Sequence, residues 1–280
     1  MEGIIVSIKY GTYVVNVGGV LYNTSPRGLL KFKEKLFVGD RVIIDSSNFV
    51  IIDVLERKSF IKRPQICNVD QILLVFSLKE PDFSYYLAFK YLTYASFNSI
   101  KASLVLTKAD KSNQKEIDEI KSTFEKVGIK TYVTSSKKEL GIDELKELFK
   151  GKITVLIGQS GVGKSSLLNA LDKNYDREIG EYSLALGRGK HKTKEVILLP
   201  YMDGFIADTP GFSSLELDMN KLEVATHFPG FESDALECYY SNCLHISEKN
   251  CKIKEKVNSK EIPSIAYENY LKLLEEVEKY

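Results

Sequence analysis

Nine consecutive residues near the middle of the chain have the types and spacing of a phosphate-binding loop, G-x-x-x-x-G-K-S. They follow the apolar run 153–157 and precede the leucine-rich run 167–171, which predicts a strand, a loop and a helix. Glycines let backbone N–H groups turn toward a phosphate, where the helix N-terminus adds positive partial charge. We expect Lys164 to act in catalysis at the β- and γ-phosphates, and Ser165 to ligate Mg²⁺. The loop predicts a nucleoside triphosphate site and comprises Gly158, Gln159, Ser160, Gly161, Val162, Gly163, Lys164, Ser165 and Ser166.

A tetrapeptide at the end of the predicted strand 103–106 has residues that could read a base. Ligands bind at the carboxyl ends of strands in open α/β sheets. There, the carboxylate of Asp110 can accept hydrogen bonds from N1–H and the exocyclic amine of guanine, which adenine cannot donate. The tetrapeptide alone is explained equally well by a solvated turn, but beside a phosphate loop it predicts a guanine site. The expected residues are Thr107, Lys108, Ala109 and Asp110, with Ser135 and Ser136 from the next strand end.

The segment after the phosphate-loop helix offers further candidates. Residues 186–194 are basic and glycine-rich. The runs 196–199 and 204–207 predict two paired strands that end in Asp208, the expected carboxylate near Mg²⁺. Gly211 can offer its N–H to the γ-phosphate.

The residue after Gly211 raises the question of how the attacking water is held. Many GTPases place a glutamine there, whereas Phe212 can neither donate nor accept a hydrogen bond. His191 in the basic segment is the candidate that could orient the water or accept its proton. The alternative is that His191 contacts RNA or remains solvated.

The order of these elements predicts a circularly permuted G domain, because the base-reading residues precede the phosphate loop. Strands alternate with helices, which implies a parallel sheet. Beside those named above, strands are expected at 71–76 and 131–133. Helices are expected over 83–97, 117–127 and 141–150, with the aromatic stripe of the first packed in the core.

Three cysteines and one histidine are clustered near the C-terminus as Cys238, Cys243, His245 and Cys251. Three thiolates and an imidazole are a complete tetrahedral set, which predicts structural zinc; the alternative is free cysteines beside a surface histidine. Cys67 lies far away in the sequence and is expected to be simply buried. A terminal amphipathic helix follows, and its apolar stripe is expected to contain Ile265, Leu271, Leu274 and Val277.

Residues 1–62 contain short alternating runs separated by turn signals such as Gly18-Gly19, which predict a small β-barrel of the OB-fold kind. The runs span 3–8, 12–17, 20–22, 41–45 and 50–54. Such barrels often bind RNA through basic and aromatic side chains, although a solvated charged loop is an equally good explanation here. The candidates are Arg27, Lys31, Phe32, Lys33, Lys35 and Phe37.

The composition of the 280 residues, 44% hydrophobic and 28% charged, is that of a globular soluble protein. No membrane-spanning run or signal peptide is evident, so we expect a cytoplasmic monomer with no membrane partner. The net charge of +1 says little about nucleic acid.

With these motifs in this order, the chain resembles the RsgA family (also called YjeQ or YloQ), circularly permuted GTPases of small ribosomal subunit assembly. The resemblance covers nearly the whole chain and implies three parts: an OB-fold barrel (1–62), a permuted G domain (63–218) and a zinc-binding helical domain (219–280). Besides the phosphate loop and the metal motif, it rests on Arg27-Gly28, Val38-Gly39-Asp40-Arg41-Val42, Asn68-Val69-Asp70-Gln71, Gly187-Arg188-Gly189 and Asp208-Thr209-Pro210-Gly211-Phe212.

The resemblance implies ribosome-stimulated GTP hydrolysis in late maturation of the 30S subunit, rRNA binding through the flanking domains, one zinc ion, and Mg²⁺ with GTP. Two residues depart from the family pattern. Thr107 stands where the base-reading motif often begins with asparagine. In the basic segment 186–194, Lys192 replaces a threonine, so the resemblance implies Thr193 as the hydroxyl that could ligate Mg²⁺. Two other hypotheses are a P-loop ATPase or small-molecule kinase, which has no use for Asp110, and a nucleotide-gated RNA-binding module with incidental hydrolysis.

Overall fold

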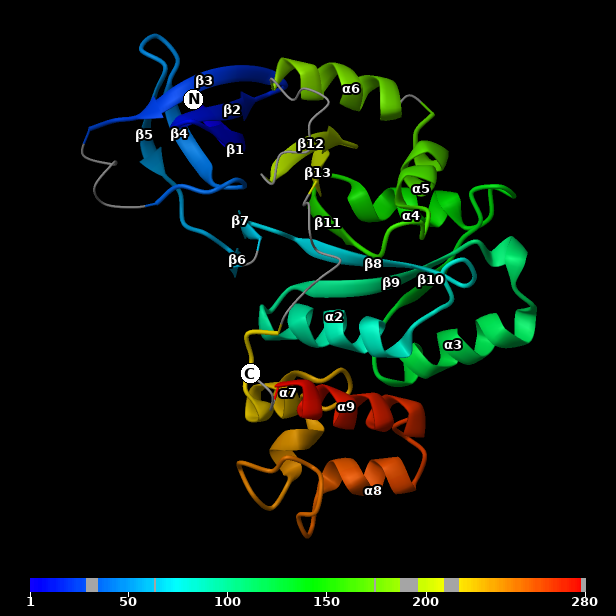
Figure 1. Ribbon diagram of the computed structural model, residues 1–280. Coiled ribbons are helices and arrows are strands. Elements are labelled where there is room, and N and C mark those ends of the chain that lie inside the picture. Colours follow the sequence, from blue (N-terminus) through cyan, green and yellow to red (C-terminus); the bar gives the residue numbers. More distant parts are fainter. Residues whose placement is uncertain (29–34, 63, 174, 187–195, 209–216, 278–280) are drawn as a thin grey trace. The chain divides into compact units, whose positions relative to one another are not determined.

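The computed structural model describes residues 1–28, 35–62, 64–173, 175–186, 196–208 and 217–277 (Figure 1). The chain forms two compact units. The first comprises residues 1–71, 143–156 and 171–212, and the second comprises residues 72–142, 157–170 and 213–280. No helix in the described ranges is both long and apolar enough to cross a membrane.

The N-terminal strands close into the predicted five-stranded barrel, in the order β1-β2-β3-β5-β4. A turn of two glycines, Gly18 and Gly19, joins β2 to β3, and both residues have positive φ angles (57° and 92°) that favour glycine. The barrel core contains Ile5, Val15, Leu36, Val42, Ile44 and Ile51. The strands are β1 (Glu2–Lys9), β2 (Thr12–Val17), β3 (Val20–Pro26), β4 (Arg41–Asp45) and β5 (Val50–Val54).

Polar residues of the family-like stretches brace the first unit rather than facing a substrate. Asp40 is fully buried and accepts hydrogen bonds from Arg57 Nε (2.7 Å) and from the Phe37 N–H (2.8 Å). Asn68 donates to Gly39 O (2.8 Å) and accepts from the Lys58 N–H (2.8 Å). These hydrogen bonds satisfy buried polar groups. The residues of these stretches therefore stabilise the fold of the first unit.

The RNA-binding hypothesis for the barrel is wrong for Phe37. Its ring is 9% exposed, and the cationic groups of Lys35 and Arg57 each lie 5.1 Å from its centroid. A ring covered in this way is not available for a base. Lys31, Phe32 and Lys33 lie outside the described residues.

The predicted alternation of strands and helices is confirmed. A six-stranded sheet has the order β10-β9-β8-β11-β13-β12; β9 pairs in parallel with β10, and β11 with β13, whereas β12 and β13 are antiparallel. The strands are β8 (Gln71–Ser77), β9 (Lys101–Thr107), β10 (Thr131–Val133), β11 (Ile153–Ile157), β12 (Ile197–Tyr201) and β13 (Gly204–Asp208), with a small hairpin of β6 (Phe60–Lys62) and β7 (Gln65–Cys67).

Helices follow most of these strands. Three of them, α6, α7 and α8, were not predicted individually from the sequence. The helices are α2 (Tyr85–Phe97), α3 (Gln114–Lys126), α4 (Ile142–Phe149), α5 (Lys164–Leu171), α6 (Tyr175–Ala185), α7 (Lys221–His227), α8 (Lys252–Asn258) and α9 (Ser264–Val277), with 3₁₀ turns at Ala109–Lys111 and Asp234–Glu237.

Helix α2 is buried on nearly all sides, from Ala88 to Ala95. It lies between β9 and the C-terminal helices α7 and α9, so an apolar stripe on one face could not reveal its full burial (Figure 1). Lys90 on α2 pairs with the carboxylate of Glu276 on α9 at 2.5 Å, and the hydroxyl of Tyr86 donates to the same carboxylate. The second unit therefore joins its C-terminal helices to α2 through buried aromatic contacts and this polar cluster.

The buried stripe of α9 differs from the expected one. Of the four expected residues, Leu274 is buried, whereas the other three are half-buried. The difference arises because Tyr270 and Asn269 are buried with their polar atoms satisfied: the Tyr270 hydroxyl donates to Leu244 O (2.6 Å) and the Asn269 amide to Ile265 O (2.7 Å). Hydrophobicity alone does not predict burial of such residues. The stripe consists of Ala266, Asn269, Tyr270, Leu273 and Leu274.

Candidate nucleotide site and metal centre

Thr107 ends β9 with its side chain turned into the protein. It is 3% exposed, and its hydroxyl lies 2.5 Å from Val162 O of the phosphate loop and 3.2 Å from Phe76 O. A hydroxyl has one proton to donate, and the shorter contact identifies Val162 O as its main acceptor. Thr107 therefore ties the base-reading segment to the phosphate loop.

Replacing Thr107 with valine should weaken nucleotide binding although the two side chains have almost the same shape. The substitution leaves the buried Val162 carbonyl without its donor, which destabilises this loop conformation by about 1–3 kcal/mol. Because the loop then populates its binding conformation less, the affinity for GDP or GTP should fall, by at most about 150-fold. Titration calorimetry measures this loss. Thr107→Ser keeps the hydroxyl and should bind nearly as the native chain does; equal binding by the valine variant would contradict the tether.

Lys108 spans from the base-reading segment to the phosphate loop. Its backbone is left-handed (φ 57°), and its Nζ donates to Gly161 O at 2.7 Å and also to Glu80 O. The side chain is thereby held along the edge of the site, where its stem can cover a base. The contact with Glu80 could not be predicted, because it comes from the loop before α2 and has no motif of its own.

Asp110 is held by a neighbour that the sequence analysis also singled out. The Ser135 hydroxyl donates to its carboxylate at 2.6 Å, and this bond lowers the pKa of Asp110 below its usual value. The carboxylate is therefore an ionised acceptor at neutral pH and can accept further N–H donors. The structure places Thr107, Lys108, Asp110 and Ser135 at one edge of the second unit, together with Gly161 and Val162 of the phosphate loop.

Asp110→Asn should weaken GTP binding and favour xanthosine triphosphate. The introduced amide would lose the acceptor that pairs with the guanine amine, and it would present a donor to the oxygen that xanthine carries in that place. Competition binding with GTP, xanthosine triphosphate and ATP measures the change, with Asp118→Asn on exposed α3 as the matched control. Equal affinity of the native chain for ATP and GTP would contradict the assignment.

The phosphate loop has the close backbone approaches that require glycine. A Cβ on Gly158 would lie 2.1 Å from Val75 O, and Gly163 has a φ of 98°. Lys164 opens α5, and its Nζ donates to Gly158 O (2.5 Å) and Gln159 O (2.9 Å) across the loop. Burial lowers the pKa of Lys164 from its usual value. The lysine is thus folded over the loop, where phosphate oxygens of a nucleotide would meet it.

Other predicted site residues lie on described elements: Ala109 opens a 3₁₀ turn, Ser136 lies in the turn after β10, and Ser165 and Ser166 lie in the first turn of α5. Asp208 ends β13 in the first unit. His191, Thr193 and Gly211 lie outside the described residues, so their roles remain predictions from the sequence.

The four predicted metal ligands do come together. Their ligand atoms all lie within 4.8 Å of one another. His245 Nδ1 is 3.6 Å from Cys238 Sγ and 3.4 Å from Cys251 Sγ, and the two sulfurs are 3.9 Å apart. A tetrahedral zinc ion with bonds of about 2.3 Å has ligand–ligand edges of about 3.8 Å. The cluster, completed by Cys243, therefore fits a four-coordinate metal ion.

Residues outside the ligand set support this cluster. Burial lowers the pKa of His245, so the imidazole is neutral and can act as a ligand. The carboxylate of Glu248 accepts hydrogen bonds from the backbone N–H groups of Leu244, Ile246 and Ser247 at 2.8–3.0 Å. The Tyr267 hydroxyl on α9 donates to His245 O (2.6 Å). These supporting contacts could not be predicted from residue spacing, because they depend on how the metal-binding loop packs against α9.

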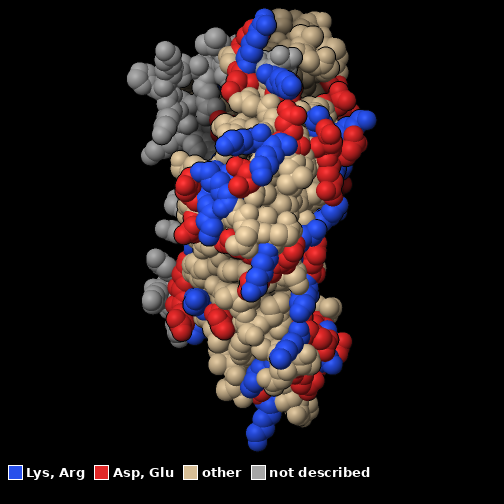
Figure 2. Space-filling view, turned by 90° about the vertical axis from the view of Figure 1, so that its right-hand side faces the viewer, with Lys and Arg blue, Asp and Glu red and all other residues tan. Residues whose placement is uncertain are grey.

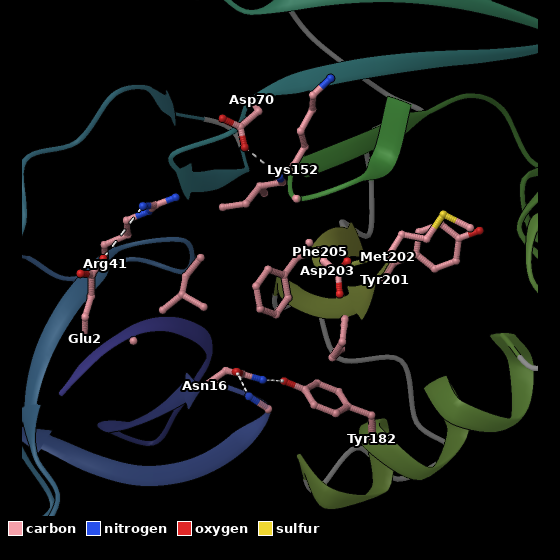
Figure 3. A pocket seen from close by; sticks show the side chains of 18 of the residues that line it. Glu2, Asn16, Arg41, Asp70, Lys152, Tyr182, Tyr201, Met202, Asp203 and Phe205 are labelled. Carbon is pink, nitrogen blue, oxygen red and sulfur yellow. Dashed lines mark hydrogen bonds and ion pairs between the residues drawn. The ribbon is translucent and has the colours of Figure 1, made fainter. Parts of the chain in front are cut away.

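A separate cavity of about 820 Å³ lies in the first unit and is lined by none of the predicted site residues (Figure 3). Some of its polar groups pair with one another: Asn16 Nδ2 lies 3.3 Å from the Tyr182 hydroxyl, and Asp70 accepts a hydrogen bond from the Ile153 N–H at 2.8 Å (Figure 3), whereas the buried Tyr201 hydroxyl has no hydrogen-bond partner among the described residues. We assign it no ligand.

The geometry of the second unit defines a class: a P-loop protein whose guanine-reading segment precedes its phosphate loop, followed by a Cys₃His metal cluster. The family model described as RsgA GTPase matches residues 54–218. The small ribosomal subunit biogenesis GTPase RsgA of Carboxydothermus hydrogenoformans is 42% identical over 99% of this chain and 98% of its own length. That of Halalkalibacterium halodurans is 39% identical over 99% and 97%.

Two solved structures agree with these matches. YjeQ from Thermotoga maritima is 34% identical with a TM-score of 0.84, covering 99% of this chain and 98% of its own. YloQ, described as a circularly permuted GTPase, is 32% identical with a TM-score of 0.81, covering 99% and 95%. The chain belongs to the RsgA GTPase family. It is a circularly permuted GTPase, which leaves the ATPase and kinase hypothesis without support.

Proposed function

We propose that this GTPase acts in late maturation of the small ribosomal subunit, that the subunit stimulates its hydrolysis of GTP, and that segments 1–62 and 219–280 bind rRNA on either side of the G domain 63–218. The relatives' names support the ribosomal role, since they match this chain along almost their whole length. We further infer that the protein acts in the cytoplasm as a monomer.

The observation that carries this proposal is the placement of α2. In the loop before α2, Glu80 O accepts a hydrogen bond from Lys108 at the nucleotide site. The helix itself packs against α9. Tyr267 and Tyr270 of α9 donate hydrogen bonds to backbone carbonyls of the metal-binding loop. Binding of RNA to the C-terminal segment would therefore be coupled, through α2, to the conformation of the nucleotide site. We propose this connection as the reason the two activities share one chain.

At the site itself, we propose that GTP is bound by residues 158–166, by Thr107, Lys108, Ala109 and Asp110, and by Ser135, Ser136 and Gly211. Ser165, Thr193 and Asp208 would hold Mg²⁺, which would neutralise charge on the β- and γ-phosphates. Lys164 would stabilise the same oxygens. Zinc in the Cys₃His cluster would be structural, because four protein ligands leave no open position.

Sedimentation with purified ribosomal subunits tests the proposal. The chain loaded with a non-hydrolysable GTP analogue should pellet with small subunits and be released when GDP replaces the analogue. Large subunits serve as the control and should retain little protein. Pelleting that ignores the nucleotide, or that is equal for both subunits, would contradict the proposed role.

A further inference from the structure

Two neighbouring tyrosines of the metal-binding loop expose their rings to solvent. Tyr239 is 73% exposed and Tyr240 is 45% exposed, and both lie between the ligands Cys238 and Cys243. Their ring centroids are 4.9 Å apart and the rings are nearly perpendicular, at 84°. In this arrangement an edge of one ring meets a face of the other, so at least one face of Tyr239 is left uncovered by its neighbour.

The backbone that carries these rings is fixed. The Tyr239 N–H donates to Asn250 O at 3.3 Å, and the Cys243 N–H donates to Tyr240 O at 3.2 Å. Metal ligands stand on both sides of the pair, so a bound ion would fix both ends of this segment. Rings held in place before binding lose little conformational entropy when a partner stacks on them.

Two lysines adjoin residues in contact with this segment: Lys249 is next to Asn250, which accepts from Tyr239, and Lys252 pairs with Glu237. Lys249 precedes Asn250, is exposed, and makes no ion pair or hydrogen bond among the described residues. The Lys252 ammonium lies 3.7 Å from Glu237 and 3.9 Å from Glu255, at the long end of ion-pair distances. The nearby carboxylate of Glu248 accepts hydrogen bonds from backbone N–H groups, which favour its ionised form, so the charge of these lysines is partly offset by acidic neighbours.

Stacking matters here because charge alone gives little attraction. The whole chain has a net charge of +1, and the face shown in Figure 2 carries acidic and basic side chains interleaved. Aromatic rings bind unpaired bases of any sequence, since every base has a π-face, and adjacent lysines meet the phosphates. A single-stranded nucleic acid therefore fits this surface better than an acidic peptide, which would leave the rings unused.

We propose that Tyr239 and Tyr240 form a stacking platform for unpaired RNA bases, with Lys249 and Lys252 at the flanking phosphates. This inference rests on the proposed binding of rRNA and assigns the side chains that perform it in the C-terminal segment.

Fluorescence anisotropy with the zinc-loaded full chain and a labelled single-stranded oligoadenylate tests the platform. Tyr239→Leu keeps apolar area but removes the π-face, and should weaken binding by about 5- to 150-fold. Tyr239→Phe should bind as the native chain does. Lys115→Gln on α3 changes an exposed residue outside both segments proposed to bind RNA, and should have no effect.

The salt dependence separates stacking from charge. Tyr239→Leu should leave the slope of log affinity against log salt unchanged, whereas Lys249→Gln should reduce it by about 0.7, the contribution of one phosphate contact on a single strand. Zinc content of each variant shows that the loop has kept its metal.

Native affinity of zinc-loaded Tyr239→Leu for the oligonucleotide would overturn the platform. If that variant also bound small subunits normally while Leu236→Asp, at the neighbouring residue that is 83% exposed, did not, the surface would contact protein instead. The proposed function is tested separately, by binding of the native chain to small subunits. If the native chain did not bind them, the ribosomal role would be wrong even if Tyr239→Leu lost its affinity for RNA.

Discussion

Cys243→Ser should release the metal and unfold the C-terminal segment while the barrel stays folded. Structural zinc sites bind with apparent free energies of about 10–16 kcal/mol, and in a short segment this is folding free energy. Cys243 is 4% exposed, so the serine hydroxyl would also be buried without a metal partner. Elemental analysis should give one zinc per native chain, and hydrogen exchange should show the earliest loss of protection at 238–258.

The structure extends this prediction beyond the metal loop. His245 packs against Phe231, which contacts Phe228, and Phe228 stacks on Phe89 of α2 at 5.0 Å between centroids. Loss of the metal should therefore reduce protection in α2 as well. Cys67→Ser, a change at another buried cysteine, is the matched control and should retain zinc. Unchanged protection at 238–258 in Cys243→Ser would contradict a structural metal.

His191→Ala should abolish most of the stimulation of GTP turnover by small subunits while leaving GTP binding intact. Phe212 cannot orient the attacking water, so we expect slow hydrolysis by the isolated chain and a second group that aligns the water when a partner is bound. General acid–base groups contribute about 10²- to 10⁴-fold, and the stimulated rate should fall by an amount in that range.

Turnover of His191→Ala with saturating small subunits measures this effect, and Lys192→Ala in the same loop is the control. Nucleotide affinity and subunit binding are measured separately for each variant. Preserved stimulation would remove His191 from the mechanism and leave it as an RNA contact or a solvated residue.

Features that depend on residues close together in the sequence were predicted well. The phosphate loop, the strand ends at Thr107 and at Asp208, and the metal ligands depend on short spacings or on strand–loop–helix patterns, and each lies on the predicted element. The barrel followed from alternation and glycine turns in the same way.

Contacts between distant segments were not predictable. Thr107 was expected among the residues of the guanine site, but the contact of its hydroxyl with Val162 O of the phosphate loop was not, because it arises where the strand end turns the side chain inward. Glu276 pairs with Lys90 across 186 positions, and nothing in either local sequence indicates a buried partner. The α9 stripe was misplaced for a related reason, since Tyr270 is buried through a hydrogen bond to a remote carbonyl.

Turnover of GTP by the native, zinc-loaded chain with and without purified small ribosomal subunits tests the central claim most directly. We predict slow hydrolysis by the chain alone, a marked increase that saturates with small subunits, and no such increase with large subunits. Turnover that is the same with and without small subunits would contradict the account and favour an RNA-binding module whose hydrolysis is incidental.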